Sequence, residues 1–328
     1  MDVYDRMRRD LEKKLCDAGL ESEDVLALLD CVSRRYRIEH RDDGEIDTDS
    51  ILSDYLSCCE YERMSNGTIQ NYRLTIGAML RSLNVPLADI RPADIRGYIK
   101  TYQDQHGIAD VTANKYREYF RAFFHWCVLE GYCDHNPAAE LKPIRCEKKE
   151  IDYYTQTELE LIRSACADER DRALIEFLYS TGCRVSELCA LKKSDIDWNN
   201  GTVQLFGKGK KHRVSYLNAK AAIYLQKYLD TRTDSEEFLF LSYRGSHSLS
   251  RAGVENILNK IKNRADGQLS KKVTPHRFRH TMATTAMQHG MPIEDIQSVL
   301  GHENIDTTMV YAKTCTENVQ MNHRRYVV

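Results

Sequence analysis

A stretch without hydrophobic periodicity divides the chain near its middle. Between Pro137 and Tyr153 the sequence contains Pro143 and the charged run at 147–150, and its apolar residues follow neither a helical nor an alternating pattern. A chain of 328 residues is long enough for two domains, each with its own core. We therefore expect a helical N-terminal extension at 1–45, a helical domain at 46–140, a linker at 141–153 and a second domain at 154–328.

Before the linker, apolar residues recur at helical spacing. Ile69, Tyr72 and Ile76, for example, share one face of a helix. Pro92 is suited to the first turn of another helix, and Gly131 is suited to end a third. The first domain is thus predicted to be all-helical, with helices over 66–80, from Pro92 onward and over 110–129.

After the linker, the periodicity changes twice. Thr155 and Glu158 form a capping box that opens a helix. Over 196–216 the apolar residues alternate and are interrupted by Asn199-Asn-Gly201, which predicts strands joined by tight turns. Helical spacing then returns from Ala219. The predicted fold class is mainly α with a small antiparallel β-sheet.

The net charge of −2 is distributed unevenly along the chain. Residues 1–150 carry 22 Lys and Arg against 28 Asp and Glu, whereas residues 151–328 carry 25 against 21. Two basic patches lie in the second half, at Gly207–Arg213 and at Lys260–His280. We expect the second half to bind a polyanion.

Apolar runs and cysteines limit the class of protein further. No apolar run approaches the roughly 20 residues that span a bilayer, and the start of the chain lacks a signal-peptide core. The 11 cysteines include no Cys-x-x-Cys pair, so we interpret them as reduced thiols rather than zinc ligands. We expect a cytoplasmic, nucleoid-associated protein with no membrane contact, no metal and no cofactor.

Four short motifs carry side chains that suit phosphate chemistry. Each is weak alone, because an isolated Arg, His or Tyr is usually structural or solvated. In chain order the motifs are Thr181-Gly-Cys-Arg-Val-Ser-Glu-Leu188, the glycine-flanked Lys208, Pro275-His-Arg-Phe-Arg-His280, and Leu300-Gly-His302 with Tyr311 nine residues later.

Together these motifs supply what attack on a phosphodiester needs without a metal. Arg184 and Arg279 can bind the nonbridging oxygens, which gain negative charge in the transition state. Tyr311 is a candidate nucleophile, although a phenol needs a positive environment and a proton acceptor to react. Lys208 could protonate the departing sugar oxygen.

The two histidines of this set would add further donors. His276 and Arg279 are three residues apart, so on a helix opened by Pro275 they share one face near the positive end of the helix. His302 follows the helix end that is predicted at Gly301.

At these positions the sequence resembles the tyrosine recombinase family, also called phage integrases, and its smaller Xer-like members. The resemblance covers about residues 46–328. It implies a helical, SAM-like core-binding domain and a mixed α/β catalytic domain that together clamp DNA in a C shape. It also implies a site-specific recombinase or integrase that cleaves and rejoins DNA through a 3′-phosphotyrosine and a Holliday junction, without metal or ATP. The implied active site is Arg184 with Glu187, Lys208, His276, Arg279, His302 and Tyr311.

The resemblance also implies partners. These are double-stranded DNA with a specific recombination site, three further copies of the chain in a tetramer on two duplexes, and accessory DNA-bending or directionality proteins. The tail after Tyr311 would dock on a neighbouring subunit through Cys315, Val319 and Val327, whereas the acidic residues 1–45 suit packing better than DNA binding. Candidate DNA contacts are Lys115, Arg117, Arg121, Lys210, Lys211 and Arg277.

Three alternatives remain open from the sequence. A type IB topoisomerase would share the tyrosine chemistry but relax supercoils, and a regulator could keep the fold and bind DNA without catalysis. A metal-dependent nuclease could use His276, His280 and His302, although Arg277 and Arg279 would repel the cation.

Overall fold

The computed structural model describes residues 48–146, 151–207, 212–243, 247–265, 267–312 and 327. The chain divides into two compact units at Glu147 and Lys148, within the linker expected at 141–153. Each unit has a hydrophobic core of its own. The extension expected at 1–45 lies outside the described residues.

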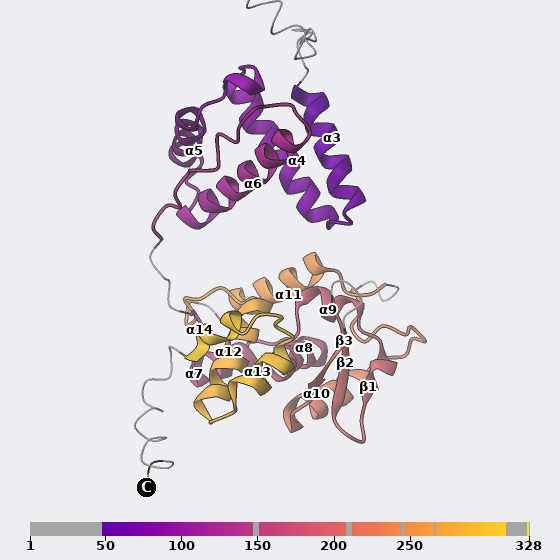
Figure 1. Ribbon diagram of the computed structural model, residues 1–328. Helices are drawn as coiled ribbons and strands as arrows, with labels where there is room; N and C mark the ends of the chain where they lie inside the picture. The colour runs from indigo at the N-terminus through magenta and orange to yellow at the C-terminus, as the bar shows by residue number, and fades with distance from the viewer. Residues whose placement is uncertain are drawn as a thin grey trace, which may run out of the picture. The chain divides into compact units, whose positions relative to one another are not determined.

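The N-terminal unit is helical, as predicted. Ser65 caps α4 by accepting a hydrogen bond from the backbone N of Thr68, and Pro92 occupies the first turn of α5. The third expected helix has the predicted bounds, 110–129. The elements of this unit are α3 (Thr48–Tyr61), α4 (Asn66–Leu83), η1 (Leu87–Asp89), α5 (Pro92–His106) and α6 (Asp110–Leu129), and the α-helices are labelled in Figure 1.

Aromatic side chains of α6 form the centre of this unit. Phe120, Phe123 and Phe124 are fully buried, and Ile76 and Met79 of α4 are buried with them. The helical stripes that the sequence predicts are therefore the faces that pack together.

The C-terminal unit contains the helices and strands of the predicted second domain. Thr155 and Glu158 form the expected capping box at its start. The elements are α7 (Gln156–Ser164), α8 (Glu169–Thr181), α9 (Val185–Ala190), η2 (Lys193–Asp195), β1 (Ile196–Asp197), β2 (Thr202–Phe206), β3 (His212–Tyr216), α10 (Ala219–Asp230), α11 (Arg251–Arg264), α12 (Pro275–Gln288), α13 (Ile293–Leu300) and α14 (Asp306–Ala312).

The three strands form an antiparallel sheet in the order β1-β2-β3, which confirms the predicted fold class. In β3 it is the polar residues, and not the apolar ones, that face the core. Because Val203 pairs with Ser215 and Leu205 pairs with Arg213, the polar residues of β3 share the buried face of β2. Val214 and Tyr216 are exposed instead.

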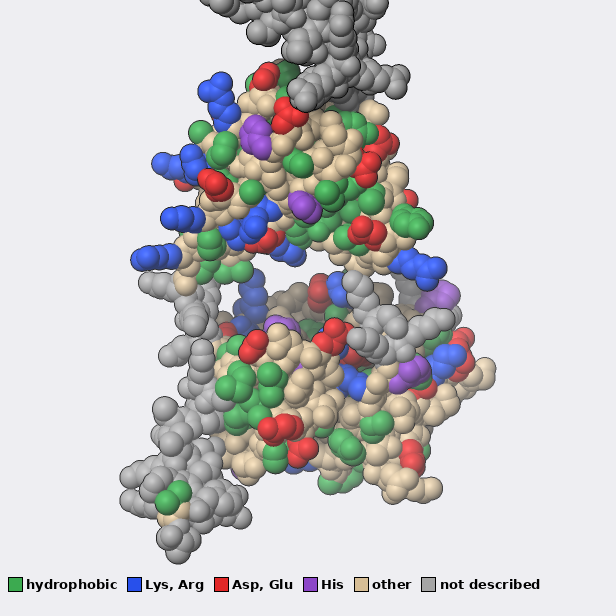
Figure 2. Space-filling model, in the orientation of Figure 1, with side chains coloured by type: hydrophobic (Ala, Val, Ile, Leu, Met, Phe, Trp, Pro, Cys, Tyr) green, Lys and Arg blue, Asp and Glu red, His purple; other side chains and the backbone are tan. Residues whose placement is uncertain are grey.

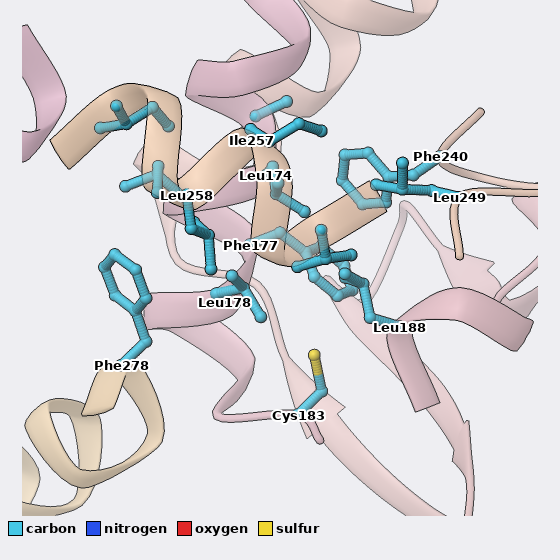
Figure 3. Close-up of a cluster of buried hydrophobic side chains, with 14 of the residues drawn as sticks. Leu174, Phe177, Leu178, Cys183, Leu188, Phe240, Leu249, Ile257, Leu258 and Phe278 are labelled. Carbon is cyan, nitrogen blue, oxygen red and sulfur yellow. The ribbon is translucent and has the colours of Figure 1, made fainter. Parts of the chain in front are cut away.

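Helix α8 lies at the centre of the unit and packs against α10 and α12. Figure 3 shows Leu174, Phe177 and Leu178 of α8 among the side chains of Phe240 and Leu258. This packing brings the C-terminal end of α8, which Arg184 follows in the chain, beside α12, which carries His276 and Arg279.

Two further findings concern the cysteines and the apolar character of the helices. None of the described cysteines forms a disulfide. Within the described ranges, no helix combines the length and the apolar character needed to cross a membrane.

Candidate active site

Arg184 lies at the junction between α8 and α9. Gly182 ends α8 in the left-handed conformation, with φ of 56°, and a Cβ at this position would lie 2.4 Å from Cε of Met282. Only glycine fits such a turn without strain. The chain then reverses, and Arg184 becomes the residue before the first turn of α9.

Glu187 holds Arg184 at this junction. Its carboxylate accepts a hydrogen bond from the Arg184 backbone N at 2.8 Å and another from Nη1 at 3.0 Å. The Arg184 side chain nevertheless remains 45% exposed, so its guanidinium is accessible to a ligand.

The same carboxylate is bound by Arg213 of β3, a residue that the sequence analysis did not single out. Arg213 Nη2 lies 2.7 Å from Oε2 of Glu187, and Nη1 donates to the backbone O of Val299. Burial raises the pKa of Glu187, but the Arg213 hydrogen bond and the charges of Arg213 and Arg184 outweigh it and lower the pKa. No pattern in the sequence marks Arg213, because its role depends on a carboxylate in α9.

Arg279 is held on α12 by backbone carbonyls. Nη1 donates to O of Gly182 at 2.7 Å and Nη2 to O of Leu300 at 2.6 Å, while the residue is only 4% exposed. Burial and the nearby charges of Arg184 and Arg213 lower its pKa to about 10, so it stays protonated at neutral pH. The two bonds use two of the five N–H donors of a guanidinium.

The structure brings Arg184, His276 and Arg279 together around one cavity of about 290 Å³. Burial, followed by the charges of Arg279 and Arg184, lowers the pKa of His276. The cavity is also lined by Arg251 and Glu255 of α11, which no sequence motif marks.

His302 lies directly after α13, which ends at Gly301 in the left-handed conformation. A Cβ on Gly301 would lie 2.5 Å from Cδ of Arg213, so this turn requires glycine. Nδ1 of His302 lies 2.8 Å from Oγ1 of Thr308, which fixes the ring. Burial and the charges of Arg279 and Arg184 lower the pKa of His302 to about 4, so it is neutral at pH 7.

Tyr311 is buried on α14, with 2% of its surface exposed. Its ring packs in a small apolar cluster with Ala283, Ile296 and Leu300. Its hydroxyl lies 2.9 Å from Nδ1 of His280. Burial raises the pKa of Tyr311 and Arg279 partly opposes the increase, so the phenol is protonated at neutral pH.

The remaining predicted residues either lie outside the described residues or have no tested role. Lys208, Lys210 and Lys211 lie outside the described residues, as do Cys315 and Val319, whereas Val327 is exposed. The other four candidate DNA contacts stay predictions, and each of them also has an intramolecular contact. Arg117 donates to O of Leu141, Arg277 pairs with Asp152, Lys115 lies over the ring of Tyr119, and Arg121 lies 3.8 Å from Glu118.

The N-terminal unit also has a basic cavity. It has a volume of about 230 Å³ and lies between α5, α6 and the segment that follows them. Figure 2 shows Lys and Arg side chains gathered along the left side of this unit. The basic residues that line the cavity are Arg96, Lys100, Arg117 and Lys142.

The histidines do not form a metal site within the described part of the chain. No three His, Cys, Asp or Glu side chains come together there as a set of ligands. Nδ1 of His280 and Nδ1 of His302 instead face the hydroxyls of Tyr311 and Thr308.

A cavity lined by three arginines and a histidine, with a tyrosine on the neighbouring helix, defines the class of site. It suits an enzyme that binds a phosphodiester and attacks it with a side chain.

Comparisons with known proteins give the family. Residues 152–317 match the phage integrase family, and residues 51–132 match the phage integrase N-terminal SAM-like domain. Tyrosine recombinase XerC of Halalkalibacterium halodurans is 31% identical over 302 residues, which are 86% of this chain and 98% of that protein. Tyrosine recombinase XerD of Proteus mirabilis is 29% identical over 302 residues, with coverage of 87% and 95%.

Two solved structures share the fold. The Tn1549 transposon integrase in complex with transposon right end DNA has a TM-score of 0.70 and 18% identity, with 85% of this chain and 99% of that chain covered. A lambda integrase tetramer bound to a Holliday junction has a TM-score of 0.67 and 21% identity, with coverage of 85% and 86%. The chain belongs to the phage integrase family of tyrosine recombinases, and its function is that of a site-specific recombinase that breaks and rejoins DNA. The topoisomerase alternative is not favoured.

Proposed function

We propose that this protein recombines DNA at a specific site by using Tyr311 as the nucleophile. In the first step the phenolic oxygen attacks the scissile phosphorus and forms a 3′-phosphotyrosine, while the bond from phosphorus to the 5′ oxygen breaks. The phenolic proton leaves to a base, and Lys208 protonates the 5′ oxygen. In the second step a 5′ hydroxyl from the partner duplex attacks the phosphotyrosine and releases Tyr311.

The charges around the cavity support this chemistry. The guanidiniums of Arg184 and Arg279 would stabilise the extra negative charge on the nonbridging oxygens. His276 and His302 are neutral, so each can donate one hydrogen bond without adding charge. The phosphotyrosine conserves the energy of the broken bond, so rejoining needs no nucleotide.

One observation carries the proposal: residues from two distant motifs, Arg184 on one side and His276 with Arg279 on the other, line the same cavity. Gly182 makes this possible, since its carbonyl binds Arg279 and its left-handed turn places Arg184. A regulator that binds DNA without catalysis would not need such a cavity.

The partners follow from the same proposal. We propose double-stranded DNA with one recombination site as the substrate, with contacts to DNA from each of the two units. The structures of related integrases with DNA and with a Holliday junction support a homotetramer on two duplexes. We place the protein at the nucleoid, with 1–45, 46–140, 141–153 and 154–328 as extension, core-binding domain, linker and catalytic domain.

The experiment has two stages. DNA that is trapped covalently on the protein in its native cell is sequenced to identify the site. A duplex with that site and a nick near the scissile phosphate is then incubated with the full chain, so that the cleaved fragment diffuses away and the adduct accumulates.

We expect a protein–DNA adduct with the unmodified chain and none with Tyr311→Phe. Tyr243→Phe, an exposed tyrosine elsewhere, serves as the control. An adduct that persists in Tyr311→Phe would exclude Tyr311 as the nucleophile.

A further inference from the structure

The imidazole of His280 contacts the proposed nucleophile, yet the chemistry above gives it no role. His280 directly follows Arg279 on α12 and lies one helical turn after His276. The ring centroids of His276 and His280 are 4.2 Å apart, in an edge-to-face arrangement. His280 therefore links the phenol of Tyr311 to a residue that lines the phosphate cavity.

The direction of the hydrogen bond follows from the protonation of its two partners. Tyr311 is protonated, and a phenol has one hydrogen to donate. His280 is neutral at pH 7, because burial together with His276 and Arg279 lowers its pKa to about 4. Nδ1 therefore accepts the bond from the hydroxyl, and the ring proton is on Nε2.

The apolar neighbours of Tyr311 act on its ring rather than on its hydroxyl. Ala283, Ile296 and Leu300 pack against the ring and offer only apolar surface. Apolar contacts fix the plane of a ring, but a hydrogen bond is needed to fix the direction of a hydroxyl.

We propose that His280 is a positioning residue for the nucleophile, whose Nδ1 holds the Tyr311 hydroxyl within reach of the phosphate-binding cavity. The inference rests on the proposed function, since it assumes that Tyr311 attacks the phosphate. It requires no proton transfer to His280. A reacting atom that is misplaced by about 1 Å can cost about 100-fold in rate, so loss of this bond should slow cleavage.

Substitution of His280 by Asn or by Gln distinguishes a positioning role from simple packing. The side-chain oxygen of Asn lies at nearly the position of Nδ1 of His and can accept the same bond. Gln is longer and places its amide near the position of Nε2. If His280 only fills space, the two substitutions should behave alike.

The test measures the rate of adduct formation with the nicked duplex at saturating DNA, for the unmodified chain and for His280→Asn, His280→Gln and His280→Leu. We expect His280→Asn to stay within about threefold of the unmodified rate, and His280→Gln and His280→Leu to fall by about 10-fold to 100-fold. The DNA dissociation constant should be unchanged in all of them, because His280 contacts the nucleophile rather than the DNA backbone.

The outcomes distinguish this inference from the proposed function. Equal rates for Asn and Gln, or an unmodified or faster rate for Leu, would overturn the positioning role. If the unmodified chain forms no adduct, or one that survives Tyr311→Phe, the proposed function itself fails. Thermal unfolding checks that each variant is folded, and if Leu is not, the Asn and Gln pair decides.

Discussion

The two arginines of the cavity are held in different ways, and their substitutions should differ accordingly. Arg184 is half-exposed and bound by a carboxylate, whereas Arg279 is buried and bound by two carbonyls. Arg184→Ala should therefore act mainly on catalysis. Removal of one transition-state donor typically costs about 10²-fold to 10³-fold in rate. DNA affinity should change little, because the phosphate concerned is one of many contacted. Adduct kinetics and a binding titration on the same duplex check this, and an equal loss of affinity would contradict it.

Arg279→Ala should have the same catalytic effect and an additional structural one. It leaves the carbonyls of Gly182 and Leu300 without this donor in a buried site. An unsatisfied buried group costs about 1–3 kcal/mol. We expect urea unfolding to show a lower free energy of unfolding for Arg279→Ala than for Arg184→Ala. Equal stability of the two variants would mean that the carbonyls find other donors.

Glu187 makes the stability of the unit depend on pH. Its pKa in the folded protein is lowered from 4.5, so its contribution is fully present above that value and is lost as the pH falls through the lower folded pKa. Glu187→Gln should lower the free energy of unfolding at pH 7, because buried Arg213 loses its counter-charge. The variant should also lose less stability than the unmodified chain between pH 7 and acid pH. Urea unfolding at both pH values measures this, and parallel losses in the two proteins would contradict it.

At the scale of elements, tight turns at two glycines join the helices that carry the site. Gly301 and Gly290 both adopt positive φ, but only Gly301 has a neighbour in the way of a side chain. Gly290→Ala should cost about 1 kcal/mol from backbone strain alone. Gly301→Ala should cost more, because its Cβ would meet Arg213, and it should also slow adduct formation by displacing His302. Unfolding and adduct rates of this matched pair test the claim, and identical effects would refute it.

The sequence predicts the elements better than it predicts their contacts. Helical stripes, capping residues and the Asn-Gly turn act locally, so the helices and the sheet follow from short segments such as 110–129 and 196–216. Arg213 was not predicted as a site residue, and His280 was considered only as a metal ligand, for a physical reason. The role of Arg213 depends on a carboxylate in α9, and that of His280 depends on a tyrosine 31 positions later. Such pairings are set by packing between elements and leave no periodic trace.

At the scale of the whole molecule, both units carry basic cavities although the net charge is −2. The proposed function needs DNA contacts from each unit. Lys100 and Lys142 are exposed at the cavity of the N-terminal unit and are therefore suited to bind phosphate groups.

The salt dependence of DNA binding measures the number of these phosphate contacts. Each phosphate that is neutralised on B-DNA contributes about −0.9 to the slope of log K against log salt concentration. If Lys100 and Lys142 each bind one phosphate, the double substitution to Gln should make the slope less negative by about 2. Lys220 and Lys227 are exposed on α10 and line neither of these cavities, so their double substitution to Gln is the matched control and should leave the slope unchanged. Binding titrations of the full chain over a range of salt concentrations give both slopes. Equal slopes for the two double variants would place the DNA on another face of the N-terminal unit.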